Sequence, residues 1–121
     1  MTVLAKVVND AVISKYEIGL HGLTIGRSRE SDVVLEGHGV DACHCRFIQE
    51  PNPDFAEFVE TYIDDIDGGN PTYVNGVTIS GKYKLRHDDQ IRVGEHHFVF
   101  YAAKIEIKDS LSNSADIARD M

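Results

Sequence analysis

The stretch Tyr73-Val74-Asn75-Gly76-Val77-Thr78-Ile79 predicts a β-hairpin. Valine, isoleucine, threonine and tyrosine favour strands, and here they flank a two-residue Asn-Gly turn. Asn75 and Gly76 both accept the positive φ that a type I′ turn requires, so this turn should fix the register of its two strands. We therefore assign Asn75 and Gly76 an architectural role.

Outward from this hairpin, short β-branched or aromatic runs recur at intervals of about eight to twelve residues, a spacing typical of a β-sandwich or barrel. Pro51 and Pro53 lack the N–H that a strand ladder needs, so they predict an exposed loop. The expected strands are Val3–Val8, Val12–Ile18, Leu23–Ile25, Val33–Leu35, Cys45–Gln49, Phe55–Ile63, Tyr73–Val74 with Val77–Ile79, Tyr83–Leu85, Ile91–Val93 and His97–Tyr101.

The chain has 121 residues, of which 42% are hydrophobic and 26% are charged. This length and composition predict one globular domain with a real core. We place a β-sandwich domain at residues 1–103. Residues 104–121 are expected to hold a terminal strand, Lys104–Lys108, and a Ser- and Asp-rich C-terminal tail.

The formal net charge is -8, and its acidic residues are unevenly placed. The segment from Glu50 to Asp67 contains acidic residues and no basic residue, which predicts a solvated face or loop. Nucleic-acid binding requires the opposite sign of charge, so we do not expect it. Neither a membrane-spanning apolar run nor a signal-peptide pattern is present in the sequence, so the expected location is cytoplasmic and no membrane partner is expected.

Cys43 and Cys45 are separated by one residue, so in a strand their side chains point to opposite faces. A mutual disulfide is therefore geometrically poor, and reduced thiols fit a cytoplasmic protein. Cys43-His44-Cys45 together with His87, His96 and His97 offers side chains of the kinds that bind zinc, but Cys-x-Cys lacks the spacer of most structural zinc sites. We expect no metal, no cofactor and no enzyme activity, because no nucleophile is paired with a base.

Several short motifs follow one another along the chain, and any one of them alone is weak. They are Gly26-Arg27-Ser28, Ser31-Asp32-Val33, His44, Asn70-Pro71-Thr72-Tyr73-Val74-Asn75-Gly76 and Asp89-Gln90-Ile91-Arg92-Val93-Gly94. In this order and spacing they resemble the forkhead-associated (FHA) domain family over roughly residues 3–103. The resemblance implies an all-β sandwich of two twisted antiparallel sheets with about eleven strands. It also implies a protein-interaction module that reads phosphothreonine peptides through loops at one end.

The resemblance assigns roles to individual residues of these loops. Arg27, with Ser28 and Arg29 beside it, is placed to bind phosphate, and a planar guanidinium suits that task. Asn70 matches the residue that hydrogen-bonds the peptide backbone. The remaining two residues are structural: Gly26 permits a tight turn, and His44 braces the loops.

Two positions depart from the family pattern. Asp41 stands where the family has a phosphate-contacting serine, and Pro71 follows Asn70 where the family usually has glycine. A carboxylate about 4 Å from a phosphate would cost on the order of 4 kcal/mol at an effective dielectric of about 20. Two functions therefore stay open: a phosphothreonine reader acting as a signalling adaptor, or a phosphate-independent interaction, dimerisation or assembly domain. The partner's identity and the oligomeric state stay open too.

Overall fold

The computed structural model describes residues 2–66 and 69–102, which form eleven β-strands. In order they are β1 (Val3–Val8), β2 (Ala11–Glu17), β3 (Leu23–Gly26), β4 (Val33–Val34), β5 (Cys45–Pro51), β6 (Val59–Asp65), β7 (Thr72–Val74), β8 (Val77–Thr78), β9 (Lys82–Lys84), β10 (Gln90–Val93) and β11 (His96–Tyr101). In these two ranges no helix is long and apolar enough to cross a membrane. The predicted strand Lys104–Lys108 lies outside the described residues.

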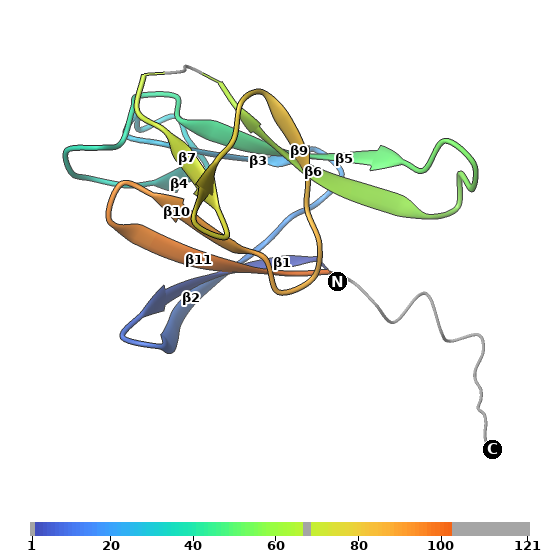
Figure 1. The fold of residues 1–121 in the computed structure, drawn as a ribbon, viewed down its shortest axis with the longest axis horizontal. Coiled ribbons are helices and arrows are strands. Elements are labelled where there is room, and N and C mark those ends of the chain that lie inside the picture. Colours follow the sequence, from blue (N-terminus) through green and yellow to red (C-terminus); the bar gives the residue numbers. More distant parts are fainter. Residues whose placement is uncertain (1, 67–68, 103–121) are drawn as a thin grey trace.

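The strands form two sheets that pack face to face (Figure 1). One sheet has the strand order β2-β1-β11-β10-β7-β8, and the other has the order β4-β3-β5-β6-β9. This is the predicted sandwich of about eleven strands. One strand pair departs from the expected antiparallel pattern, because β3 and β4 run parallel, with Ile25 opposite Val33.

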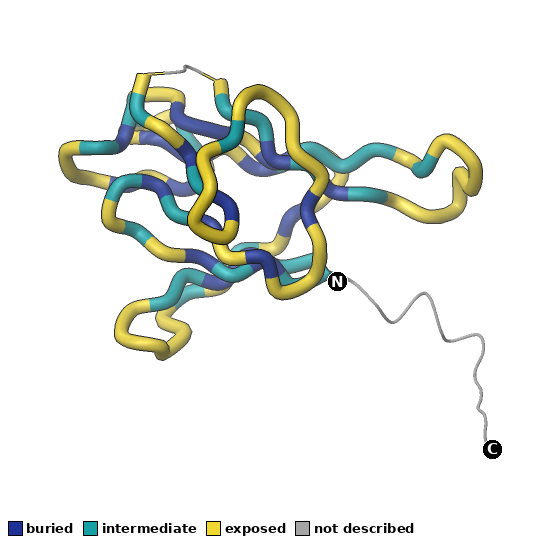
Figure 2. Tube along the Cα trace, in the orientation of Figure 1, coloured by how far each residue is buried: buried dark blue, intermediate teal, exposed yellow. Residues whose placement is uncertain are grey.

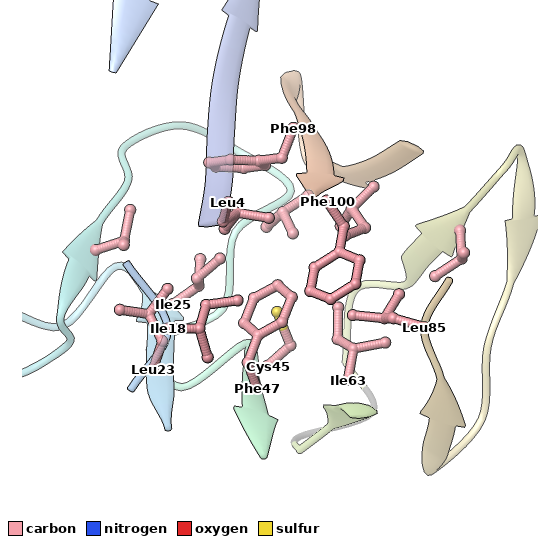
Figure 3. Close-up of a cluster of buried hydrophobic side chains, with 14 of the residues drawn as sticks. Leu4, Ile18, Leu23, Ile25, Cys45, Phe47, Ile63, Leu85, Phe98 and Phe100 are labelled. Atoms are coloured by element: carbon pink, nitrogen blue, oxygen red, sulfur yellow. The ribbon is translucent and has the colours of Figure 1, made fainter. Parts of the chain in front are cut away.

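The core lies between the two sheets and is filled by alternating apolar side chains. In β11, Phe98 and Phe100 are each 1% exposed, whereas the flanking His97 is exposed to solvent. In the same cluster, Phe100 points toward Phe47 and Ile63 of the opposite sheet, and Phe98 lies beside Leu4 (Figure 3). Burial of such side chains contributes about 1.5–3 kcal/mol each, so this interface supplies most of the driving force for folding.

The Asn75-Gly76 turn has the predicted geometry. Asn75 has a φ of 54° and Gly76 a φ of 83°, the positive values of a type I′ turn. Val74 pairs with Val77 across the turn, so β7 and β8 are in the register that the turn demands.

The expected strand Phe55–Ile63 is wrong at its N-terminal end. β6 begins at Val59, and Phe55 and Phe58 lie in the turn before it. Asn52 causes the difference, because its side-chain oxygen accepts hydrogen bonds from the backbone of Asp54 and Phe55 and holds a compact turn there.

The prediction of an exposed loop is wrong for Pro51, which belongs to a strand. It is the last residue of β5 and stands opposite Val59 of β6. An exposed strand end tolerates the missing N–H of proline, so Pro51 ends the ladder without interrupting it.

Among the described acids of the acidic segment, Glu50 lies on β5, Glu60, Asp64 and Asp65 lie on β6, and Asp54 and Glu57 lie in the turn between these strands. Three of its acids form ion pairs across strands, with N···O distances of 2.7 to 3.3 Å. The pairs are Lys82 with Glu50, Lys84 with Glu60, and Arg46 with Asp64. Exposed pairs of this kind contribute little to stability individually, but they limit repulsion between neighbouring carboxylates.

Candidate functional site

Three loops meet at one end of the sandwich and together form the apical loops, which we define as residues 26–29, 40–44 and 69–71. The first two run side by side as a short backbone ladder. The Arg27 N–H donates to the Asp41 carbonyl at 2.9 Å, and the Ser28 N–H donates to the Ala42 carbonyl at 3.1 Å. The site residues predicted on these two loops are therefore brought together.

Gly26 makes this close approach possible. A Cβ at this position would lie 2.1 Å from the Ala42 carbonyl oxygen, inside any allowed contact distance. Gly26 is the final residue of β3, and its φ is not in the positive range. The predicted reason for this glycine, a tight turn, is therefore wrong: the side chain is excluded by the neighbouring loop.

Arg27 is exposed at the surface of the apical loops. Its Nη1 donates to the Val40 carbonyl at 2.8 Å, which orients the guanidinium along the second loop. A guanidinium carries five N–H donors, so this bond leaves donors for a ligand. Within residues 2–66 and 69–102, no carboxylate lies within 4 Å of the guanidinium.

Ser28 and Arg29 continue the same loop. The Ser28 hydroxyl accepts a hydrogen bond from the Glu30 N–H at 3.2 Å, so it shapes the turn while remaining half-buried. Arg29 is exposed beside it. The two arginines give this loop a positive surface in a chain that is acidic overall.

Asp41 is turned toward Asn70 on the third loop. Its Oδ2 accepts the Asn70 backbone N–H at 2.8 Å, and its Oδ1 accepts the Asn70 side-chain amide at 2.7 Å. Partial burial raises the pKa of Asp41, but these hydrogen bonds and the neighbouring positive charge outweigh it, so the pKa lies below its ordinary value. The sequence identified both residues and not the link between them.

Gly69 allows that link to form. A Cβ on Gly69 would lie 2.9 Å from the Asp41 Oδ2. A side chain there would push the carboxylate away from Asn70. No sequence motif singled out Gly69, and only the distance to a residue 28 positions earlier reveals its importance.

His44 is fully buried beneath the apical loops and connects two of them. Its Nδ1 accepts the Asp41 backbone N–H at 3.0 Å, and its Nε2 lies 3.2 Å from the Pro71 carbonyl oxygen. Since a carbonyl can only accept, Nε2 must carry the proton, and the imidazole is neutral. The approach of Nδ1 to the Asp41 carboxylate at 4.0 Å is accordingly not an ion pair.

Asn75 lies apart from these loops and has partners that the sequence did not indicate. Its side-chain amide donates to Asp89 at 2.9 Å, and its side-chain oxygen accepts the Gln90 N–H at 2.9 Å. Asp89 is only 7% exposed and also accepts the Arg86 N–H. The hairpin turn is thereby tied to the segment that precedes β10.

The two cysteines have opposite environments. Cys43 is exposed on the apical loops, and Cys45 is buried at the start of β5. Burial raises the pKa of the Cys45 thiol strongly, with a further contribution from the nearby Asp65 carboxylate. Both are free thiols. Cys43 lies in the turn before β5, so the two cysteines do not share a strand as the prediction assumed.

The fold is a two-sheet β-sandwich that carries polar loops, hydrogen-bonded to one another, at one end. The FHA domain family model matches residues 23–94, which hold all the predicted site residues. The chain belongs to the FHA domain family.

The chain is also similar to known proteins and solved structures. It is 32% identical over 84 residues to mouse proliferation marker protein Ki-67, a match that covers 69% of this chain and 2% of that protein. The MEK1 FHA domain has 24% identity and a TM-score of 0.71, with 83% of this chain and 88% of that chain covered.

Two further solved structures contain peptides. The MEK1 FHA domain in complex with a HOP1 pThr318 peptide has 25% identity and a TM-score of 0.66, covering 84% of this chain and 96% of that one. Mycobacterium tuberculosis EmbR in complex with a low-affinity phosphopeptide has 22% identity and a TM-score of 0.67, covering 83% of this chain and 24% of that one.

Proposed function

We propose that this domain binds phosphothreonine-containing peptides of protein partners through its apical loops. The observation that carries the proposal is the convergence of exposed Arg27 and Arg29 with Asn70 on loops that are already hydrogen-bonded to one another. A site held in place before binding loses little conformational entropy when the ligand arrives. The related MEK1 FHA domain, solved with a pThr peptide, supports the same ligand class.

In this proposal the Arg27 guanidinium binds the phosphate, with Ser28 and Arg29 contributing from the same loop. Charge-assisted hydrogen bonds of this kind are roughly twice as strong as neutral ones. Asn70 binds the peptide backbone through its side-chain oxygen and its second amide N–H, since the first N–H is donated to Asp41. Gly26 and His44 act as structural supports.

Asp41 is the position that sets the affinity. Its carboxylate keeps its negative charge, because the Asn70 groups that hydrogen-bond to it are neutral. We therefore propose weak phosphate dependence compared with a loop that carries serine at this position. The role of Asp41 is to hold Asn70 with two carboxylate oxygens, whereas a serine offers a single hydroxyl oxygen.

The second candidate is an interaction that does not require phosphate. The observation that favours it is the Asp41–Asn70 link itself, because a negative charge in the loop opposes a dianionic ligand. In that case the apical loops would bind an uncharged or basic segment, or a second copy of the domain.

The domain is proposed to act as a non-catalytic adaptor in cytoplasmic signalling. The two free thiols support a reducing compartment, where disulfides are rare. The surrounding acidic surface supports protein partners over nucleic acids, because a net charge of -8 repels phosphate backbones.

Titration with an oriented phosphothreonine peptide library, with the unphosphorylated library alongside, tests the proposal. We expect phosphorylation to increase affinity, and Arg27→Ala to remove that gain. Arg86→Ala is the matched control, because Arg86 is an exposed arginine outside the apical loops. Equal binding of both libraries would reject the phosphate reader and leave the phosphate-independent module.

A further inference from the structure

The turn between β5 and β6 carries an exposed apolar surface that has no part in the proposed phosphopeptide site. We call residues 52–59 the hairpin tip. The β5–β6 hairpin projects beyond the rest of the sandwich, and its tip is almost entirely exposed (Figures 1 and 2). Phe55, Phe58 and Val59 are 57%, 41% and 49% exposed. Two of these apolar side chains, Phe55 and Phe58, form a ring pair, unlike a single exposed one.

The backbone that carries the two rings is held by a hydrogen-bond network centred on Asn52. The Asn52 side-chain oxygen accepts hydrogen bonds from the backbone N–H groups of Asp54 and Phe55, at 2.8 and 2.9 Å. The Asn52 backbone N–H donates to the Phe58 carbonyl at 2.8 Å. The Asn52 side-chain nitrogen donates to the Glu60 carboxylate at 2.7 Å, and this bond anchors the tip to β6.

The two phenylalanines pack against each other and not into the core. Their centroids are 6.1 Å apart with an interplanar angle of 60°, an edge-to-face pair. Ordered aromatic side chains give large contact areas and lose little entropy when a partner binds. The hairpin tip therefore has the physical character of a binding surface.

The charges around the rings define the partner's chemistry. Asp54 and Glu57 are exposed at the tip, and the sequence from Glu50 to Asp67 contains no basic residue. The lysines of β9 pair with Glu50 and Glu60. Within residues 2–66 and 69–102, Asp54 and Glu57 have no ion-pair partner. An apolar centre with an acidic rim complements aliphatic side chains flanked by lysine or arginine.

We propose that the hairpin tip is a second binding surface, which takes a protein segment carrying leucine, isoleucine or valine flanked by lysine or arginine. The aliphatic side chains pack on Phe55 and Phe58, and the basic side chains pair with Asp54 and Glu57. This surface lies at the far end of β5 and β6 from His44, roughly 20 Å away at about 3.3 Å per residue. It therefore operates without the phosphate chemistry of Arg27.

A displayed library of unphosphorylated peptides, randomised among lysine, arginine, aspartate, glutamate, leucine and isoleucine, tests this surface. Selection on the whole chain is compared with selection on F55S/F58S and on the matched control V77S, which removes an exposed valine of β8. We expect enrichment of basic-aliphatic peptides on the wild-type chain and on V77S. For the best peptide we expect at least a tenfold loss of affinity in F55S/F58S.

A charge-reversal variant gives an independent readout. D54K/E57K keeps both rings, and we expect it to lose affinity for basic-aliphatic peptides and to select acidic-aliphatic ones. Affinity of the wild-type chain should fall as salt rises, because exposed charges are screened. Enrichment that is unchanged in F55S/F58S, or absent on the wild-type chain, would overturn the proposal. Self-association of the chain that is lost in F55S/F58S, without peptide enrichment, would assign the tip to a second copy and also overturn it.

Discussion

The Asp41 carboxylate holds Asn70 with both of its oxygens, at 2.8 Å from the backbone nitrogen and 2.7 Å from the side-chain nitrogen. Asp41 and Asn70 are 29 residues apart, so this contact closes the apical loops. The same carboxylate sets the charge beside Arg27. Asp41 thus affects both the stability of the loops, through its hydrogen bonds to Asn70, and the charge that a ligand of Arg27 would meet. Different substitutions at this position can separate the two effects.

Asp41→Asn should destabilise the fold by about 1–2 kcal/mol at pH 7, since one hydrogen bond from Asn70 would face an amide N–H instead of an oxygen. Because folding lowers the pKa of Asp41, its stabilising contribution is complete above the ordinary value of about 4 and is lost as pH falls through the lower folded value. Urea unfolding between about pH 7 and pH 2 should show the difference between wild type and variant shrinking in acid. A difference that does not depend on pH would contradict this account of Asp41.

Asp41→Ser should strengthen phosphothreonine peptide binding by about tenfold, because it removes a negative charge from the loop that faces Arg27. The gain is smaller than Coulomb's law at about 4 Å implies, since solvent screens the loop and Asn70 becomes less restrained. Isothermal titration at two salt concentrations measures the effect. Glu57→Ser, which removes an acid at the opposite end, is the control and should leave the affinity within about twofold. An unchanged affinity in Asp41→Ser would show that the carboxylate does not oppose the phosphate.

Gly26→Ala should destabilise the fold by about 1–3 kcal/mol, because the new methyl group would meet the Ala42 carbonyl oxygen and separate two loops. Thermal unfolding measures the change. Gly19→Ala is the matched control, since a Cβ at Gly19 has no heavy atom within 4 Å and its φ is not positive. If both variants unfold at the wild-type temperature, the close approach at Gly26 is not a constraint.

Asn75→Gly should destabilise the fold by about 1–3 kcal/mol, although glycine accepts the positive φ as readily as asparagine. The loss comes from the two hydrogen bonds that tie the hairpin to Asp89 and Gln90. Asn9→Gly is the control, because Asn9 also has a positive φ of 53° at a hairpin turn. Chemical denaturation should show a small change for Asn9→Gly, and equal changes in both variants would mean that only φ matters.

The two thiols should react with iodoacetamide at very different rates. Cys43 is exposed and should be modified in the folded protein, whereas Cys45 is buried with a raised thiol pKa and should react only through unfolding. Mass spectrometry over time should show one fast and one slow modification, and Cys43→Ser should leave only the slow one. Rapid modification of both cysteines would place Cys45 at the surface.

The sandwich was predictable because strand signals are local. Alternating apolar residues mark β11, and Asn75-Gly76 marks the hairpin, each within a few residues of sequence. The segment from Phe55 to Phe58 misled the prediction, because two aromatic residues favour a strand by propensity. The side chain of Asn52 overrides that propensity through backbone hydrogen bonds, an effect that composition does not reveal.

The residues of the site could be predicted from the sequence, but the contacts between them could not. The order of motifs identified Arg27, Asp41, His44 and Asn70 as one group. The pairing of Asp41 with Asn70 depends on how two distant loops meet, and Gly69 is important only because that carboxylate approaches it. Contacts over such separations follow from the assembled fold.

The β5–β6 hairpin keeps a fixed distance between the apical loops and the hairpin tip. Its strands are paired at every residue from Cys45 to Pro51, so the apical loops and the hairpin tip cannot approach each other without breaking that ladder. One ligand that occupies both surfaces at once must reach about 20 Å, which requires at least about six extended residues between its two anchoring groups. The domain would thus select partners whose two anchoring groups are far enough apart to reach both surfaces. Peptides with a shorter spacer between these groups would gain no avidity.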